Sequence, residues 1–335
     1  MPDERALQQI WYGGQAPSFG LKMLAGVYGA VAALRRALFR SGLLKTQRLP
    51  VPVVVVGNIT VGGTGKTPLV IALIEAMRMR GYNPGVVSRG YAGSAAAPLR
   101  VEAQADPAVV GDEARLIRDA TGAPVVVGRD RVAAARLLIE TAGVDLIIAD
   151  DGLQHYRLGR DVEICVIDGE RRFGNGRLLP AGPLREPLAR LDSVAFRVVN
   201  GGVPEPGEVA MQLIGTQAAA LLDPTERQPL AFFHDRRVHA VAGIGHPQRF
   251  FAQLRAAGVD AIEHAFPDHH AFVPSDLAFG DDLAVLMTAK DAVKCRAFAQ
   301  PHHWCVPVRA QLPPEFIEAL AASLASASVR ARKTG

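Results

Sequence analysis

The stretch PVVVVGNITVGGTGKTP, residues 52–68, decides the fold of this chain. Its first part, Pro52–Val56, is a short β-branched run bounded by Gly57, which is typical of a buried parallel strand. A glycine-rich loop follows, and then an apolar-periodic segment that we expect to be helical from Lys66 until Gly81. Strand, glycine loop and helix in this order predict a phosphate-binding loop, or P-loop.

The loop carries the residues that a nucleoside triphosphate requires. Its glycines let backbone N–H groups approach the phosphates, and the helix N-terminus adds partial positive charge. We expect Lys66 to reach the β- and γ-phosphates and the Thr67 hydroxyl to bind Mg²⁺. One position departs from the strict pattern, which has glycine where this chain has Thr60, and a glycine-rich hairpin with an incidental Lys-Thr pair is the alternative. The predicted nucleotide-binding residues are Thr60, Val61, Gly62, Gly63, Thr64, Gly65, Lys66 and Thr67.

Strand-like and helix-like segments alternate through the rest of the first half. We expect strands at 86–88, 124–127, 144–149, 162–167 and 194–199 and helices at 112–120 and 131–141. Repeated β–α units predict an α/β fold, with a P-loop NTPase-like parallel sheet covered by helices on both faces. Beyond the turn-rich segment NGGVPEPG at 200–207, a smaller C-terminal α/β domain is expected.

Composition and charge limit the function classes. The chain has 335 residues, of which 49% are hydrophobic and 21% charged, so it is not a disordered chain. Its three cysteines are widely spaced, which argues against a disulfide framework. The net charge of +4 is concentrated in residues 1–50, where seven basic residues face Asp3 and Glu4. A general nucleic-acid binder is therefore disfavoured, and a local anionic partner such as a membrane surface is favoured.

A helix over residues 21–40 would be amphipathic. Its uncharged run, Met23–Leu34, has twelve residues and is shorter than the roughly 17–25 that span a bilayer. The helix either lies in a membrane interface with its apolar stripe in lipid, or packs that stripe against its own domain. The stripe consists of Leu24, Val27, Tyr28, Val31, Leu34 and Leu38, and the other face of Lys22, Gly26, Gly29, Ala33, Arg36 and Arg40.

Two acidic positions stand out. Asp150 directly follows the apolar run Val144–Ala149, where a P-loop enzyme needs a second carboxylate for Mg²⁺. The alternative is that Asp150 and Asp151 cap the next turn. Asp112 is at the start of an expected helix, where an acid is more often a helix cap than a base.

At DDGLQH, residues 150–155, the pattern becomes more specific. Together with the P-loop stretch, GDEA at 111–114, GPLREP at 182–187 and DHHAF at 268–272, it makes the chain resemble the tetraacyldisaccharide 4′-kinases. Members of this family phosphorylate the 4′-hydroxyl of a lipid A precursor disaccharide on the cytoplasmic face of the inner membrane. The motifs follow one another in order, and the resemblance covers nearly the whole chain.

The resemblance implies roles for individual residues. It implies a catalytic dyad of Asp112 and His269 across the domain cleft, with His270 as the alternative histidine. The segment TAKDAVK departs from the family by having Ala289 where an acid is expected. The implied site residues are, as catalytic groups, Asp112, His269 and Lys66; near Mg²⁺, Thr67, Asp150 and Glu186; around the phosphates, Asp151 and His155; and as cationic groups, Arg131 and Arg185.

The implied reaction is transfer of the γ-phosphoryl group of ATP, with Mg²⁺, to a tetraacyldisaccharide 1-phosphate, giving lipid IVA. The protein would act as a peripheral or monotopic protein on the cytoplasmic face of the inner membrane, with no nucleic acid and no obligatory protein partner. Its regions would be a membrane-interface region at 1–50, a P-loop kinase core at 51–207, and a β-linker with the smaller domain carrying the DHH motif at 208–335. Closure of the two domains would exclude water, so ATP hydrolysis without acceptor should be slow.

Two other functions compete with this one. A P-loop ligase or kinase with a soluble substrate would not need the basic, apolar amino terminus. A partner-binding P-loop ATPase would not need the DHH element in a second domain, and a GTP switch is disfavoured because Lys290 and Asp291 are adjacent rather than in Asn-Lys-x-Asp spacing.

Overall fold

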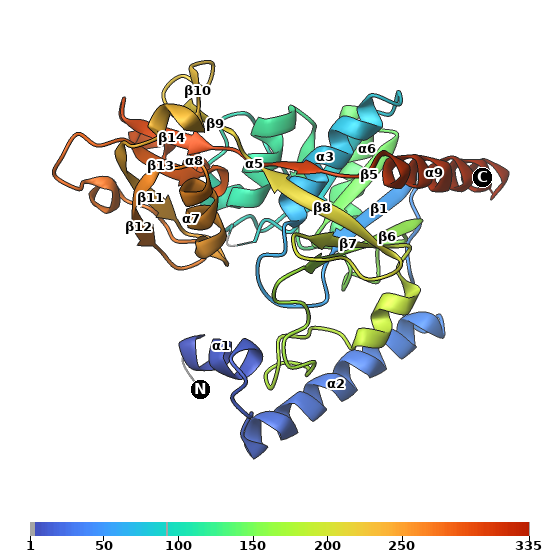
Figure 1. The fold of residues 1–335 in the computed structure, drawn as a ribbon. Helices are drawn as coiled ribbons and strands as arrows, with labels where there is room; N and C mark the ends of the chain where they lie inside the picture. Colours follow the sequence, from blue (N-terminus) through green and yellow to red (C-terminus); the bar gives the residue numbers. More distant parts are fainter. Residues whose placement is uncertain (1–3, 92, 335) are drawn as a thin grey trace.

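Two β-sheets organise the chain. Within residues 4–91 and 93–334, which the computed structural model describes, one sheet has nine strands and the other has six (Figure 1). The larger sheet and its helices form a P-loop lobe, and the smaller sheet forms a second lobe beside it. The amino-terminal helices lie below the P-loop lobe in the view of Figure 1.

The nine-stranded sheet has the order β15-β8-β7-β6-β1-β5-β2-β4-β3. Strands from β8 to β4 in this order run parallel, and the edge strands β3 and β15 are antiparallel to their neighbours. The predicted α/β fold with a parallel sheet is therefore confirmed. The strands are β1 (Val53–Gly57), β2 (Pro84–Ser88), β3 (Leu99–Arg100), β4 (Val125–Val127), β5 (Leu146–Asp150), β6 (Val162–Asp168), β7 (Phe196–Asn200), β8 (Glu208–Ile214) and β15 (Arg309–Gln311).

Helices cover both faces of this sheet because its central strands are apolar on both sides. Successive side chains of a strand point to opposite faces, so Val54 packs in one core cluster and Val55 in the other. The first cluster lies under α3 (Lys66–Arg78), α4 (Pro107–Val110), α5 (Asp112–Thr121) and α9 (Pro314–Thr334). The second lies under α6 (Arg131–Ala142).

The second lobe is also a sheet with helices on both faces, but it is smaller. Its strand order is β10-β9-β14-β13-β11-β12. Helix α7 (Pro247–Ala256) covers one face and α8 (Ala289–Cys295) covers the other. The strands are β9 (Gln217–Ala220), β10 (Arg227–Pro229), β11 (Arg237–Ala242), β12 (Asp260–Ala265), β13 (Val285–Thr288) and β14 (His303–Val306). Short 3₁₀ turns are η1 (Leu188–Ser193), η2 (Leu230–Phe233), η3 (Pro274–Leu277) and η4 (Arg296–Phe298).

The two lobes do not divide at the expected position near residue 207. Strand β8 pairs with β7 in the large sheet, and β15 returns from the second lobe to pair with β8. Helix α9 then packs on the P-loop lobe through Phe316 and Leu320. The second lobe is thus an insertion of about residues 215–308 between β8 and β15. The turn-rich stretch at 200–207 interrupts secondary structure but does not mark a lobe boundary.

Helices α1 (Glu4–Tyr12) and α2 (Phe19–Arg40) dock on the P-loop lobe by one side only. On α2, Leu21 and Ala25 are buried, and the Tyr28 hydroxyl donates to the backbone oxygen of Arg185 at 2.9 Å. At Gly29 the helix passes close to Leu178: a Cβ there would lie 2.8 Å from a methyl carbon of this side chain, which would have to shift.

The opposite side of α2 is exposed. Leu24, Val27, Val31 and Leu34 are 58–62% exposed, whereas Tyr28 and Leu38 of the predicted stripe are half-buried. The interpretation in which the stripe packs on the chain's own domain is therefore wrong for these four residues. In the described part of the chain, no helix combines the length and apolarity needed to cross a bilayer. We call these four residues the apolar stripe of α2.

Candidate active site

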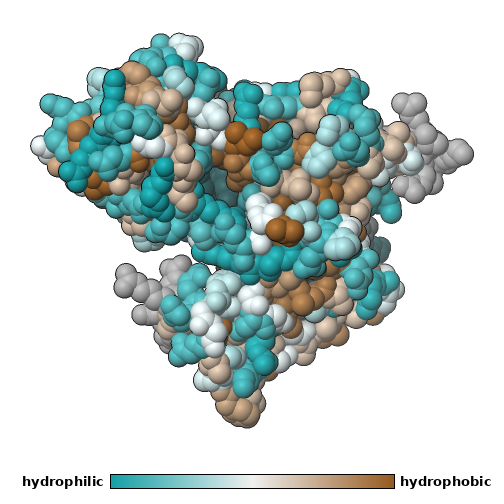
Figure 2. All heavy atoms as spheres, viewed as in Figure 1, coloured by the Kyte–Doolittle hydropathy of each residue, from teal (hydrophilic) through white to brown (hydrophobic). Residues whose placement is uncertain are grey.

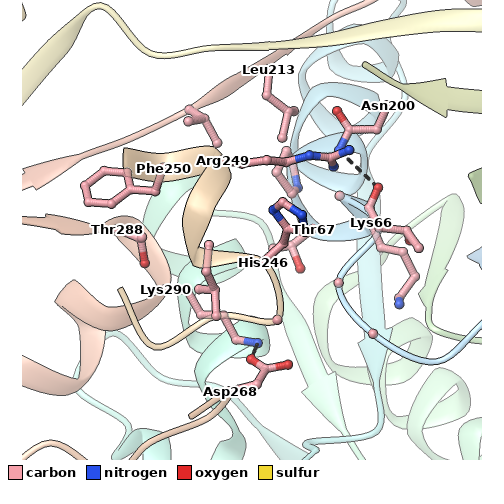
Figure 3. Close-up of a pocket in the computed structure, with 18 of the residues that line it drawn as sticks. Lys66, Thr67, Asn200, Leu213, His246, Arg249, Phe250, Asp268, Thr288 and Lys290 are labelled. Carbon is pink, nitrogen blue, oxygen red and sulfur yellow. Dashed lines mark hydrogen bonds and ion pairs between the residues drawn. The ribbon is translucent and has the colours of Figure 1, made fainter. Parts of the chain in front are cut away.

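A cleft of about 1010 Å³ lies between the lobes, and Figure 2 shows a hollow at this junction. The P-loop, residues 61–68, forms one wall with Asp151 and Arg185. The second lobe supplies the facing wall from the start of α7, the DHH loop and the first turn of α8 (Figure 3). The ends of parallel strands and the amino-terminal ends of helices thus meet where ligands bind in open α/β sheets.

The P-loop has the conformation that its glycines permit. Gly62 and Gly65 have φ of +106° and +91°, in the region that favours glycine. A Cβ on Gly65 would lie 2.5 Å from the amide nitrogen of Asn200, which donates to the Thr64 carbonyl at 3.2 Å. The loop ends at the amino terminus of α3, so its N–H groups and the helix dipole are available to an anion.

Lys66 extends along the cleft wall between two oxygen groups. Its Nζ lies 3.4 Å from Asn58 Oδ1 and 3.4 Å from Asp151 Oδ1. Asp151 also accepts from Arg185 Nη1 at 3.1 Å, and its own backbone is left-handed with φ +47°. Although burial opposes the charged form, Lys66 and Arg185 hold the pKa of Asp151 well below its usual range. One carboxylate therefore holds two cations at the phosphate loop.

The GPLREP segment lies directly against the P-loop. The Val61 N–H donates to Pro183 at 2.9 Å, and the Arg185 N–H donates to Ile59 at 2.7 Å. This pairing places the Arg185 side chain in the cleft beside Asp151. Because Tyr28 of α2 bonds to the Arg185 carbonyl, the exposed helix is tied to a residue of the cleft wall.

Asp150 ends β5 and is 1% exposed. Neither of its side-chain oxygens has a hydrogen-bond partner among the described residues. Burial, with repulsion from Glu113, raises the pKa of Asp150 to about 7. Val56 lies opposite Asp150 in the sheet, and its strand leads into the loop that ends at Thr67. A buried carboxylate without a partner, at the end of the strand that pairs with β1 just before the P-loop, fits a divalent cation.

A cation at this position would take few ligands from the protein. Among residues 4–91 and 93–334, no cluster of three or more His, Cys, Asp or Glu side chains is arranged to hold a metal ion.

Six of the expected site residues do not line the cleft: Thr60, Asp112, Asp150, Arg131, His155 and Glu186. Arg131 is 3% exposed and donates to the carbonyls of Gly128 and Asp150, at 2.9 and 3.1 Å, and burial lowers its pKa to about 10. It therefore lies behind Asp150, where it supports the end of β5. Burial, with the charge of Arg131, lowers the pKa of His155 to about 4, so this imidazole is neutral.

Glu186 is engaged by other side chains. Its carboxylate accepts from Gln154 at 3.0 Å and from the Tyr156 hydroxyl. Burial and this carboxylate together raise the pKa of Tyr156 to about 12. Each of its two oxygens thus accepts a hydrogen bond from the protein.

Asp112 and His269 meet across the lobes. Asp112 is the first residue of α5 and is 5% exposed, and His269 Nδ1 lies 3.0 Å from its Oδ2. His269 has a left-handed backbone with φ +60°, a conformation that is uncommon outside glycine. Burial opposes ionisation, but the hydrogen bond from His269 and the charge of Lys290 lower the pKa of Asp112. The carboxyl group is thus ionised at neutral pH.

The alternative histidine faces elsewhere. His270 Nε2 lies 2.9 Å from Asp276 Oδ2, and its ring packs against Phe266 and Phe272. The structure therefore assigns the contact with Asp112 to His269 and not to His270.

Lys290 and Asn200 are two of the cleft residues that the sequence did not predict. Lys290, on α8, points into the cleft and contacts Asp268 at 3.1 Å (Figure 3). Asn200 supports the P-loop from the end of β7 but stands in a stretch that the sequence shows only as a turn. The signal at Lys290 was present in TAKDAVK, next to Ala289, which itself lies in the cleft wall. Neither contact follows from spacing, because each joins segments more than 20 residues apart.

The P-loop carries a lysine, and the adjacent strand end has a buried carboxylate without a hydrogen-bond partner among the described residues. Together these features define a nucleotide-dependent enzyme. Lobe contact adds an acid and an imidazole to this site, the residue types that general acid–base catalysis uses. Fold and site together therefore define the class of P-loop phosphotransferases.

Comparison with known proteins narrows this class. A family model described as Tetraacyldisaccharide-1-P 4'-kinase matches residues 18–325, so the chain belongs to this kinase family. The relative named Tetraacyldisaccharide 4'-kinase from Stenotrophomonas maltophilia is 54% identical over 320 residues, which cover 92% of this chain and 94% of the relative. The one from Xanthomonas euvesicatoria pv. vesicatoria is 54% identical over 91% of this chain and 92% of its own.

A solved structure agrees with this assignment. The "apo" form of LpxK from Aquifex aeolicus, in complex with ATP, has a TM-score of 0.75 and 27% identity, and the match covers 90% of this chain and 97% of that one. The resemblance seen in the sequence is confirmed: the chain is a tetraacyldisaccharide 4′-kinase of lipid A biosynthesis and uses ATP with Mg²⁺.

Proposed function

We propose that the chain phosphorylates the 4′-hydroxyl of a tetraacyldisaccharide 1-phosphate, giving lipid IVA, at the cytoplasmic face of the inner membrane, with Asp112 as the base. The observation that carries this proposal is the 3.0 Å contact between Asp112 and His269 at a cleft lined by Lys66 and Thr67. An acid–imidazole pair that faces a P-loop lies beside the site of the γ-phosphate. There the acid can take the proton of the substrate's hydroxyl.

The residues of the P-loop lobe bind and align the nucleotide. The N–H groups of residues 60–67 and the Lys66 ammonium hold the β- and γ-phosphates, and Arg185 adds a second cation on the same wall. Thr67 and Asp150 are the residues that would hold Mg²⁺, which neutralises charge on the β- and γ-phosphate oxygens when bound. Asp112 accepts the proton of the hydroxyl, while His269 orients the carboxylate.

Contact between the lobes supports the exclusion of water. A Cβ on Gly245 of the second lobe would lie 3.0 Å from the backbone nitrogen of Gly63, so the two backbones need glycine to approach this closely. Arg249 Nη2 also lies 2.6 Å from Asp168 Oδ1. These contacts bring the lobes together beside the P-loop, and exclusion of water there would favour transfer to the hydroxyl over transfer to water.

The reaction is tested with γ-labelled ATP, purified protein and the disaccharide 1-phosphate. We expect label in the lipid with Mg²⁺ present and none after chelation. We also expect little label as free phosphate when the lipid is omitted. Rapid ATP hydrolysis without lipid would contradict the closed arrangement, and label transfer to soluble sugars alone would favour a soluble substrate.

The apolar stripe of α2 supports the membrane location. Four exposed aliphatic side chains lie on a helix that also carries Lys22, Arg35 and Arg40, each worth about 1 kcal/mol of attraction to anionic lipid. The helix would lie in the interface plane with this stripe in the acyl region. Through Tyr28 and Arg185, the face that meets lipid is coupled to the cleft wall.

The membrane contact makes a prediction of its own. The double variant Val27→Glu/Val31→Glu should fail to float with vesicles of phosphatidylethanolamine and phosphatidylglycerol, whereas wild type floats. Val203→Glu/Leu222→Glu is the matched control, because these residues are also exposed, at 84% and 59%, but lie outside α2. Equal flotation of both double variants would show that α2 is not the membrane contact.

A further inference from the structure

We propose that Lys290 is a positioning residue for the dyad, which keeps the proton of His269 on Nδ1, the nitrogen that faces Asp112. It does so by donating a hydrogen bond to the other ring nitrogen. This inference rests on the proposed role of Asp112 as the base.

The geometry of three groups carries the inference. Lys290 Nζ lies 3.3 Å from His269 Nε2, and His269 Nδ1 lies 3.0 Å from Asp112 Oδ2. An ammonium group can only donate, so Nε2 must accept and carries no proton. A neutral imidazole then has its proton on Nδ1, where it donates to the carboxylate. The two contacts together specify one tautomer of His269.

Lys290 is held in this place from both lobes. Its Nζ also contacts Glu113 of α5 at 3.3 Å and Asp268 of the DHH loop at 3.1 Å (Figure 3). Although burial opposes its charged form, Glu113, Asp112 and Asp268 raise the pKa of Lys290 well above its usual value. The ammonium is therefore permanently charged at the pH of the cell, and its donor role does not depend on pH.

The charge of Lys290 also affects proton binding by Asp112. Burial opposes ionisation of Asp112, but the charge of Lys290 lowers the pKa of this carboxyl group, so loss of the ammonium raises the pKa of the proposed base. The charged groups around His269 are Asp112 and Glu113 from α5, Asp268 from its own loop, and Lys290 and Lys294 from α8. Lys294 lies 3.8 Å from Asp112 and is paired with Asp291 at 2.9 Å, so Lys290 is the cation that contacts the ring. The Tyr91 ring packs against the imidazole and carries no charge.

A purely structural role for Lys290 has to be separated from this one, because the residue also joins the lobes. The chain offers a matched control in Arg296, whose Nη1 lies 2.7 Å from Asp119 Oδ2. That ion pair joins the same segment of the second lobe to the same helix, α5, but does not touch His269. Arg296→Gln thus removes a lobe contact and leaves the dyad intact.

The test measures kcat against pH, and the His269 tautomer by ¹⁵N NMR, in wild type, Lys290→Met, Arg296→Gln and Asp112→Asn. For Lys290→Met we expect the acidic limb of the kcat profile to move up by about one pH unit. This variant should lose about tenfold in kcat at the pH of that limb and regain most of it one to two pH units above. Wild type and Arg296→Gln should show a protonated Nδ1, and Lys290→Met a mixture of tautomers.

Two outcomes would overturn the proposal separately. If Lys290→Met lowers kcat equally at all pH values and keeps the wild-type tautomer of His269, Lys290 is a lobe contact only. An inactive Asp112→Asn would in that case leave Asp112 as the base. Wild-type turnover in Asp112→Asn would remove the base itself, and with it this role for Lys290. His269→Gln assigns the NMR signals, so the tautomer is read independently of activity.

Discussion

Asp112→Asn is expected to lower kcat by about 10²–10⁴-fold, the range that a positioned general base contributes. The substitution keeps the size of the side chain and an oxygen that can accept from His269 Nδ1, but it removes the group that takes the hydroxyl proton. ATP binding should change little, because the phosphate contacts are made by the P-loop and Lys66. Turnover with saturating substrates and ATP affinity by calorimetry check the two parts separately.

The variant has a close control and a diagnostic partner. Asp276→Asn changes the neighbouring acid–histidine pair, Asp276 with His270, and should leave kcat near wild type. His269→Gln should also lower kcat, and the double variant with Asp112→Asn should lose little more than the worse single one, because the two residues act as a unit. Unchanged kcat in Asp112→Asn would exclude this carboxylate as the base.

Lys66→Met is expected to lower kcat/KM by about 10²–10³-fold, comparable to the loss of one preorganised donor at a developing charge. The ammonium lies 3.4 Å from Asp151 in the cleft, where a γ-phosphate would compete for it. The loss should appear in kcat as well as in ATP affinity, since charge on the transferred group is redistributed in the transition state.

The fold should survive this change. Asp151 keeps its ion pair with Arg185 at 3.1 Å, so no carboxylate is left without a cation. Lys45→Met, in an exposed segment after α2, is the control for loss of one positive charge. Wild-type ATP affinity and turnover in Lys66→Met would show that the phosphates bind elsewhere in the cleft.

The sequence predicted well those features that contiguous residues determine. The β-branched run, the glycine loop and the apolar helix lie within 30 residues, and the observed β1 and α3 differ from the expected bounds by one or two residues. The position of Asp150 was predicted for the same reason, because a parallel strand that ends in an acid places it at the ligand edge of the sheet.

Features that depend on tertiary contacts were not predictable in this way. The sequence of β8 has the apolar pattern of any short strand, so it does not show which lobe the strand joins. Pairing with β7 and β15 decides this. Arg131 has the charge of a phosphate ligand, but packing puts it behind β5. The amphipathic pattern of α2 could not decide which face is exposed, since that depends on where Tyr28 and Gly29 contact the P-loop lobe.

The central claim is that an acid from one lobe, aligned by a histidine from the other, receives the acceptor's proton over the P-loop. It is tested most directly by a crystal structure with a non-hydrolysable ATP analogue, Mg²⁺ and the acceptor disaccharide. We predict the 4′-hydroxyl oxygen within about 3 Å of the Asp112 carboxylate and in line with the γ-phosphate held by residues 60–67. An ordered acceptor whose 4′-hydroxyl contacts a different base, with Asp112 and His269 turned from the γ-phosphate, would contradict it.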